Sequence, residues 1–479
     1  MFKNNILQSI PHELGEKEKI EFEHEAKWYA ETGKKKRVVK QHQEAILNNW
    51  ETNNRRGIFE MCTGSGKTFT AMCAIRESIM NKQEVPIIIV PSKILFKQWK
   101  EEINKVFSIE VAILLVGGGN KVDSKKIKRY TQNNLNSKRC ILTTYQTASR
   151  ESFFKNVIWG EHIFLVCDEV HNIGSKQTLK ILTADIGARI GLTATPQRYF
   201  DDKGTKKIID FFGGIIEPKY QIANAIKDGV LCEYFYNIVE VRLSKNEQER
   251  WNELSKSINK KLMLKDKDKN IKDLEDKFLE KLLFERADIV KKAQQKIYVA
   301  ENILIENYKP EQKWLIYLDD SEQVIQLKEL LEKHEFLKGN VFEYHTKTEN
   351  DLSQTINHFK TSGAILLSIN CLDEGVDIPS IDHAIILASS KNPRQYIQRR
   401  GRVLRKSEGK NFAYIYDCLV SPNLSENNIQ KKFSIIRGEI IRAMKFSETA
   451  VNNGVKNQIK IIMNNNGIEL IEGEFTNYG

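Results

Sequence analysis

The chain has 479 residues, of which 41% are hydrophobic and 29% are charged. A chain of this length is too long for one hydrophobic core, so we expect several domains, and its composition excludes a disordered or fibrous protein. No apolar run reaches the roughly 18 residues that a membrane-spanning helix needs, and the N-terminus carries no secretory signal pattern. These features predict a cytoplasmic protein that does not enter a membrane.

The net charge and the cysteine content further limit the class of protein. The 74 Lys and Arg residues exceed the 63 Asp and Glu residues, which gives a net charge of +11. Such an excess favours a polyanionic partner such as nucleic acid, although an AT-rich genome that favours lysine codons produces the same composition. The 7 cysteines include no C-x-x-C pair, which argues against a zinc site or a disulfide framework.

Short apolar runs recur along the chain, separated by stretches typical of helices and loops. Runs of this kind, rich in Ile, Leu and Val, are typical of strands buried on both faces of a parallel sheet. In the first half they are Gly57–Met61, Pro86–Val90, Cys140–Thr144, Ile163–Cys167, Ile190–Thr193 and Tyr236–Val241. In the second half they are Trp314–Leu318, Val341–Tyr344, Ala364–Ile369, Ala384–Ala388 and Phe412–Tyr416. Their alternation with helical stretches predicts two α/β sheets in sequence.

The residues between and beyond these runs differ in character. The segment Leu243–Tyr308 has no Pro or Gly and carries apolar residues at helical spacing, so we expect helices that join two lobes. Its charge run, Lys265–Lys272, is typical of a solvated loop. The C-terminal stretch looks helical and then strand-like at Gly467–Phe475. We therefore predict a charged helical leader, a first α/β domain, a helical connector, a second α/β domain and a helical C-terminal extension, at residues 1–36, 37–243, 244–312, 313–422 and 423–479.

A phosphate-binding loop is indicated by six consecutive residues, Thr63-Gly64-Ser65-Gly66-Lys67-Thr68. They follow an apolar strand and precede a helical run, which is the context that such a loop needs. The glycines let the backbone approach phosphate oxygens, and the helix N-terminus directs N–H groups at them. Lys67 would hold the β- and γ-phosphates, and the Thr68 hydroxyl would face Mg²⁺. The loop departs from the strict pattern because Met61 stands where the first glycine is expected.

A carboxylate pair, Asp168 and Glu169, ends a later apolar strand. In parallel α/β sheets ligands bind at the carboxyl ends of the strands. Asp168 suits a contact with Mg²⁺, directly or through water, and Glu169 suits polarisation of an attacking water. Together with the phosphate loop, the pair predicts a site that binds ATP with Mg²⁺ and hydrolyses it.

With these two motifs in place, the chain resembles the DExH-type helicases and translocases of superfamily 2, with Asp168-Glu169-Val170-His171 as the signature. Further motifs match in order and spacing over residues 37–420. The resemblance implies two tandem RecA-like domains, that is, parallel sheets flanked by helices, with helical connecting and C-terminal segments. It also implies that ATP lies between the two domains.

The resemblance assigns residues to the nucleotide base and ribose. Gln43 would read the adenine edge, since a side-chain amide offers both a donor and an acceptor, and Gln41 is the alternative. In the second lobe Gly375 would permit close backbone approach, and Asp377 would bond the ribose hydroxyl.

The resemblance also assigns residues to the γ-phosphate and to coupling. Arg402 and Arg405 would act as arginine fingers from the second lobe, and their spacing places them on one helical face with Gln398. The hydroxyls of Thr193 and Thr195 would bond the Asp168-Glu169-Val170-His171 motif and so transmit the state of the γ-phosphate.

Nucleic-acid contacts are implied for both lobes. Small hydroxyls and backbone N–H groups at strand ends bond phosphates without reading sequence. Trp99, close to the first of these motifs, is expected to pack in the core rather than to stack on a base. The residues assigned to the nucleic-acid backbone are Pro91, Ser92, Thr143, Thr144, Gln146, His345, Thr346, Ser368 and Asn370.

The resemblance favours DNA over RNA as the track. Arg286 with the segment Ala287–Lys296, and the tail segment Arg437–Asn452, are similar to helices of DNA-directed motors in restriction and repair systems. The same motifs occur in RNA-directed relatives, so an RNA helicase is an alternative, as is an ATP-gated nucleic-acid-binding scaffold that does not separate strands. The sequence has no nuclease signature, so a protein partner in a prokaryotic defence or repair complex would supply cleavage or targeting.

Overall fold

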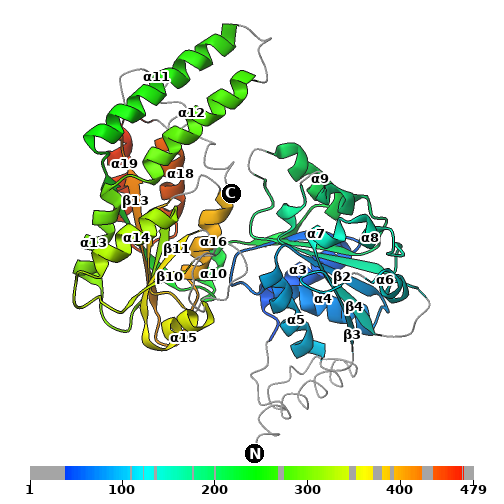
Figure 1. The fold of residues 1–479 in the computed structure, drawn as a ribbon. Coiled ribbons are helices and arrows are strands. Elements are labelled where there is room, and N and C mark those ends of the chain that lie inside the picture. Colours follow the sequence, from blue (N-terminus) through cyan, green and yellow to red (C-terminus); the bar gives the residue numbers. More distant parts are fainter. Residues whose placement is uncertain are drawn as a thin grey trace, which may run out of the picture.

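The computed structural model describes residues 38–107, 111–121, 123–133, 138–174, 177–198, 201–267, 274–344, 352–369, 380–388, 393–422, 435–466 and 468. In this part of the chain two parallel β-sheets form two lobes, each with helices packed against its sheet (Figure 1). The predicted class, two tandem parallel α/β domains, is confirmed. The expected leader and nearly all of the strand-like C-terminal end lie outside the described residues.

The first sheet has seven strands in the order β3-β4-β2-β5-β6-β1-β7. Its neighbouring strands pair in parallel, for example β2 with β5 from Val85 opposite Ile163 to Ile89 opposite Cys167. The central strands are fully buried because consecutive apolar residues face helices on both sides. The strands are β1 (Arg56–Met61), β2 (Val85–Val90), β3 (Ala112–Val116), β4 (Arg139–Thr144), β5 (Ile163–Asp168), β6 (Arg189–Thr193) and β7 (Ile215–Tyr220).

The second sheet has six strands in the order β10-β11-β9-β12-β13-β8. Its central strand pairs in parallel on both sides, with β11 and with β12. The strands are β8 (Glu233–Val241), β9 (Lys313–Leu318), β10 (Val341–Tyr344), β11 (Ala364–Ile369), β12 (His383–Ile386) and β13 (Phe412–Val420).

The helices of the first lobe cover both faces of its sheet. In α5 the buried residues Phe96, Trp99, Ile103 and Phe107 recur at helical spacing, which gives the helix one apolar face toward the sheet. The helices are α3 (Gln41–Thr52), α4 (Lys67–Met80), α5 (Lys93–Phe107), α6 (Ser124–Tyr130), α7 (Tyr145–Ala148), α8 (Glu151–Phe154), α9 (Asp202–Phe212) and α10 (Ile222–Lys227), with 3₁₀ turns at Val170–Asn172 and Thr178–Thr183.

The helices after β8 include a long hairpin. Helices α11 and α12 pair side by side and project from the second lobe (Figure 1), with Leu254, Ile258 and Leu282 buried between them. The helices are α11 (Lys245–Lys267), α12 (Leu274–Lys291), α13 (Gln295–Asn307), α14 (Ser321–Leu331), α15 (Leu352–Ser362), α16 (Pro393–Val403), α18 (Ile435–Ser447) and α19 (Gly454–Asn465). None of the helices in the described ranges is both long and apolar enough to cross a membrane.

The strand β8 belongs to the second sheet and not to the first. Our sequence division ended the first domain at residue 243, but β8 pairs in parallel with β13 from Glu233 opposite Phe412 to Val241 opposite Val420. Burial alternates along much of β8, as expected for the last strand of a sheet. The division by sequence was wrong here because neighbouring runs were assigned to one sheet by their order in the chain.

Two further differences concern elements that sequence patterns describe poorly. The strands β3 and β7 were not predicted from the sequence; they lie at the edges of the first sheet and are only partly buried. The segment Ala287–Lys296 is not one helix, because α12 ends at Lys291 and α13 begins at Gln295. At this turn the Gln294 N–H donates to Glu247 Oε1 at 3.0 Å.

The C-terminal extension is part of the second lobe. Arg442 on α18 is buried and donates to both carboxylate oxygens of Asp417 on β13, at 2.8 and 3.0 Å. It also pairs with Glu439 at 3.0 Å, and Tyr236 of β8 donates to Asp417 at 2.7 Å. The network joins α18 to two strands of the sheet.

We expect Arg442→Met to destabilise the second lobe by about 3–5 kcal/mol, because it leaves two buried carboxylates without their cation. Chemical denaturation followed by circular dichroism measures the loss. The matched control is Arg437→Met, on a partly exposed position of the same helix, which should change stability by less than about 1 kcal/mol. Equal stability of the two variants would contradict the role of this network.

Candidate active site

The phosphate loop lies between β1 and α4 and is shaped by two glycines in the left-handed region. Gly64 has φ +86° and Gly66 has φ +91°, a conformation that other residues adopt only with strain. A side chain at Gly66 would meet the amide of Gln43 at 2.5 Å. The Ser65 hydroxyl donates to the Cys62 carbonyl at 2.6 Å and closes the turn. The loop therefore has the form of a phosphate cradle.

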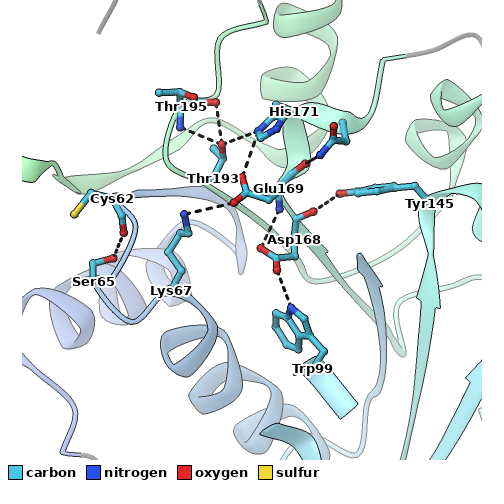
Figure 2. Close-up of polar contacts among 11 residues, drawn as sticks. Cys62, Ser65, Lys67, Trp99, Tyr145, Asp168, Glu169, His171, Thr193 and Thr195 are labelled. Atoms are coloured by element: carbon cyan, nitrogen blue, oxygen red, sulfur yellow. Dashed lines mark hydrogen bonds and ion pairs between the residues drawn. The ribbon is translucent and has the colours of Figure 1, made fainter. Parts of the chain in front are cut away.

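The carboxylate pair at the end of β5 faces this loop (Figure 2). Lys67 Nζ lies 3.8 Å from Glu169 Oε1, so the lysine and the carboxylate predicted to act together lie side by side. Glu169 has φ 47°, a costly conformation for a residue with a side chain, of the kind that collects at functional sites. Its Oε2 is buried and has no hydrogen-bond partner among the described residues. That oxygen is available to accept a proton from a bound molecule.

Asp168 is more deeply buried and is held by neighbouring groups. Its Oδ1 accepts from the Glu169 N–H at 3.0 Å, and its Oδ2 accepts from Trp99 Nε1 at 2.7 Å. Burial, followed by the adjacent Glu169 charge, raises the pKa of Asp168 to about 6. Lys67 offsets one of the two carboxylate charges in this desolvated site, and a divalent cation would offset the other. Oxygen donors from Asp168 and the Thr68 hydroxyl are of the type that Mg²⁺ prefers, so these residues fit the implied metal.

Thr193, the last residue of β6, contacts the carboxylate motif as expected. Thr193 Oγ1 lies 3.0 Å from Nδ1 of His171, and the same ring nitrogen lies 3.5 Å from Glu169 Oε2. The N–H of Thr195 donates to Thr193 Oγ1 at 3.1 Å. Thr193 therefore makes a predicted contact through its side chain, whereas Thr195 joins the network through its backbone.

Gln43, the residue assigned to the adenine, hydrogen-bonds to the phosphate loop in this structure. Gln43 is buried, its Nε2 donates to the Ser65 carbonyl at 3.2 Å, and its Oε1 accepts from the Lys40 N–H at 3.0 Å. Gln41, the alternative, is exposed. Beside them the ring of His42 stacks on Tyr220 with centroids 3.6 Å apart, an aromatic pair that no sequence spacing indicated.

Helix α16 of the second lobe lies against the phosphate loop. A Cβ placed on Gly401 would come within 2.8 Å of Thr63 Cβ, so the two lobes touch where phosphates are expected. Arg402 and Gln398 on the same helix are buried. A cavity of about 200 Å³ at this junction is lined by both lobes, including Thr195 and Arg400. The motif with the arginines therefore borders the loop.

We expect Gly401→Ala to lower ATP turnover by about 10²-fold, because the added methyl group would push α16 away from the loop and misplace its arginines. Steady-state hydrolysis measures the effect. Gly454→Ala is the matched control, since no described atom outside its chain neighbours and its own helix backbone lies within 4 Å of the position that its methyl group would occupy. If Gly401→Ala hydrolyses ATP as fast as Gly454→Ala, close contact between α16 and the loop is not needed.

Arg405 does not lie on the helical face predicted from its spacing. Helix α16 ends at Val403, and Arg405 forms a β-bridge with Leu231 instead. The Cys232 N–H donates to the Leu404 carbonyl at 2.9 Å, so pairing with the segment before β8 ends the helix. Leu231 in turn lies 3.2 Å from the Cβ position of Gly64. Arg405 thus lies beyond the end of the helix, in an isolated β-bridge to the segment before β8.

The residues assigned to nucleic acid are only partly described. Pro91 and Ser92 are partly exposed, and Gln146 is exposed. Thr143 and Ser368 are fully buried, and their hydroxyls have no partner among the described residues. Thr144 Oγ1 accepts from the Thr147 N–H at 3.3 Å and caps α7. His345, Thr346, Asn370, Gly375 and Asp377 lie outside the described residues.

Comparisons with known proteins match this architecture. The family model described as "Type III restriction enzyme, res subunit" matches residues 36–198, and "Helicase conserved C-terminal domain" matches residues 295–407. A relative in Sulfurisphaera tokodaii named "DNA 3'-5' translocase XPB2" is 27% identical over 427 residues, which cover 85% of this chain and 83% of the relative. Relatives from a Sulfolobus islandicus filamentous virus and from Haloarcula marismortui are 25% identical, and the chain spans 64% and 48% of their lengths.

Solved structures share the fold at low sequence identity. The restriction-modification enzyme LlaBIII bound to DNA aligns with a TM-score of 0.59 at 18% identity, over 86% of this chain and 30% of that one. The helicase domain of Hef from Pyrococcus furiosus aligns with a TM-score of 0.50 at 18% identity, over 79% and 95%. The two family models match in the expected order. The two parallel sheets, and the contact between the phosphate loop and the second lobe, support the same family assignment. The chain belongs to superfamily 2 of the helicases and translocases.

Proposed function

We propose that this protein is an ATP-dependent DNA helicase or translocase. The observation that carries the proposal is the contact of Gly401 with Thr63, which brings the arginine motif of the second lobe to the phosphate loop of the first. A site built from both lobes links hydrolysis to their relative motion. DNA is favoured because one relative is named a DNA translocase and one structural neighbour is bound to DNA, and because the net charge of +11 suits a polyanion.

In this proposal the first lobe holds the triphosphate. The loop amides and Lys67 bind the phosphates, Gln43 and its surroundings border the adenine, and Thr68 with Asp168 hold Mg²⁺. Mg²⁺ when bound would neutralise charge on the phosphate oxygens. Glu169 orients and polarises the attacking water, a role that suits its Oε2, which accepts no hydrogen bond within the described part of the chain.

The second lobe completes the site when the cleft closes. Arg402 and Arg405 stabilise the charge that develops on the γ-phosphate, with Gln398 beside them, and such arginines contribute about 10³–10⁵ in rate. Gly375 and Asp377 would contact the nucleotide from the same lobe. Nucleic acid that bridges both lobes favours the closed arrangement and therefore stimulates hydrolysis.

The nucleic-acid backbone would lie along the carboxyl ends of the strands in both lobes. Contacts of this type predict little sequence preference and strong dependence on salt. In the first lobe Pro91, Ser92, Thr144 and Gln146 are proposed to meet it. In the second lobe the proposed residues are His345, Thr346 and Asn370. Thr143 and Ser368, which the sequence also suggested, are fully buried and are left out of the proposed contact. A protein partner in a prokaryotic defence or repair complex would supply cleavage or targeting.

ATPase measurements with single-stranded DNA, duplex DNA and RNA, followed by strand-separation and translocation assays, test the function. We expect DNA to stimulate hydrolysis more than RNA and movement to depend on ATP. Equal or greater stimulation by RNA would identify an RNA helicase. Hydrolysis that no nucleic acid changes, without movement, would identify an ATP-gated scaffold and overturn the proposal.

A further inference from the structure

Two buried aromatic side chains donate hydrogen bonds to Asp168 (Figure 2). Trp99 Nε1 lies 2.7 Å from Asp168 Oδ2, and the Tyr145 hydroxyl lies 2.9 Å from the Asp168 carbonyl oxygen. The two aromatic residues are 1% and 4% exposed, so water does not replace these bonds. One donor fixes the carboxylate and the other fixes the backbone that carries it.

The carboxylate of Asp168 has little freedom left. Its second oxygen, Oδ1, accepts from the Glu169 N–H at 3.0 Å, so each oxygen has one donor. A carboxylate oxygen has more than one acceptor position, which leaves each oxygen able to face a cation. Groups that orient a metal ligand in this way affect metal affinity about 10–100-fold.

Both donors come from helices that begin at the proposed nucleic-acid contacts. Trp99 lies on α5, which starts directly after Pro91-Ser92, and the Ser92 hydroxyl oxygen accepts from a backbone N–H in the first turn at 3.2 Å. Tyr145 is the first residue of α7 and directly follows Thr144, the residue that caps this helix. A shift at either helix start therefore moves a side chain that is bonded to Asp168.

We infer that Trp99 and Tyr145 are positioning residues that connect the backbone-contacting segments after β2 and β4 to the metal-holding carboxylate. This inference rests on the proposed function. It adds a second connection to the one through Thr193, on the opposite side of the carboxylate motif, and it acts on the metal ligand instead of on Glu169. Nucleic acid bound at these helix starts would change how firmly Asp168 holds the cation.

The test uses variants that remove one donor and keep an aromatic ring. Trp99→Phe removes the indole N–H and Tyr145→Phe removes the hydroxyl. The matched controls are Trp314→Phe and Tyr236→Phe in the second lobe, where a buried indole donates to Gln312 at 3.0 Å and a buried hydroxyl donates to Asp417 at 2.7 Å. Thermal melts of all four full-length proteins establish that they are folded.

Binding of a fluorescent ADP analogue at increasing Mg²⁺ gives the first readout. We expect the Mg²⁺ concentration at half-maximal binding to rise about 10-fold in Trp99→Phe and about 3-fold in Tyr145→Phe, whose bond is to a neutral carbonyl. The change in intrinsic tryptophan fluorescence on adding Mg²⁺ should be lost in Trp99→Phe and kept in Trp314→Phe. Binding without Mg²⁺ should be unchanged in all four.

Stimulation of ATPase by single-stranded DNA at saturating Mg²⁺ gives the second readout. We expect it to fall by about 3-fold or more in the two site variants, while their affinity for DNA without nucleotide stays at the wild-type value. Mg²⁺ requirements and stimulation equal to those of the controls would overturn the inference, and so would a changed Mg²⁺ requirement with full stimulation. If Trp99→Phe does not fold, Tyr145→Phe decides by the same criteria.

Failure of the proposed function would look different. A wild-type protein whose hydrolysis no nucleic acid changes would remove the proposed motor activity and the connection with it. The Mg²⁺ titration would still decide, on its own, whether Trp99 and Tyr145 position the metal ligand.

Discussion

Glu169→Gln is expected to lower ATP turnover by about 10²–10⁴-fold and to leave ATP binding near the wild-type level. An amide has the size of the carboxylate but does not take up a proton from the attacking water. The wild-type side chain is suited to this step, because its Oε2 accepts no hydrogen bond from the described residues and Lys67 Nζ lies 3.8 Å from Oε1. Single-turnover hydrolysis and nucleotide titration measure the two quantities separately.

Two comparisons sharpen this result. Lys67→Ala should weaken nucleotide binding itself, because it removes the cation that holds the phosphates. Glu60→Gln, a buried carboxylate on β1, is the matched control and should keep most of the turnover. Near-normal turnover in Glu169→Gln would show that another group activates the water.

Arg402→Ala is expected to reduce nucleic-acid-stimulated turnover by about 10³–10⁵-fold with a small change in ATP affinity. Arg402 is buried next to Gly401, at the contact between α16 and the phosphate loop. Its guanidinium would act only on the charge that forms during hydrolysis, so the loss should appear in kcat. Arg402→Lys should restore little, because an ammonium group does not reproduce the planar fork of donors.

A neighbouring arginine supplies the control. Arg399 on the same helix donates to the Ala388 carbonyl at 2.8 Å and lies 4.6 Å from the centroid of Tyr317, so Arg399→Ala should lower the stability of the second lobe and not the rate of a folded sample. Wild-type kcat in Arg402→Ala would refute the assignment of this arginine to the γ-phosphate.

The parts of the site that sequence could predict are those that depend on neighbouring residues. The phosphate loop is a local turn set by Gly64 and Gly66, and the Asp168-Glu169 pair follows a strand whose apolar run is plain. The close approach of the loop and the carboxylate pair could also be predicted, because parallel strands present their carboxyl ends at one edge of the sheet.

Contacts that depend on packing between distant segments could not be predicted from the sequence. Trp99 was expected only as a core residue, and its bond to Asp168 depends on how α5 rotates against the sheet. Arg405 was assigned to a helical face by spacing, yet pairing with Leu231 ends the helix before it. For the same reason the membership of β8 followed from its hydrogen bonds with β13 and not from its place in the chain.

The position of β8 has a consequence for the cycle. Since β7 ends the first sheet at Tyr220 and β8 begins the second at Glu233, the described part of the backbone passes between the sheets once, through α10. This short linker keeps the two lobes, when they separate, at an effective concentration relative to each other on the order of millimolar. Noncovalent contacts between the two lobes can then open and re-form as intramolecular events.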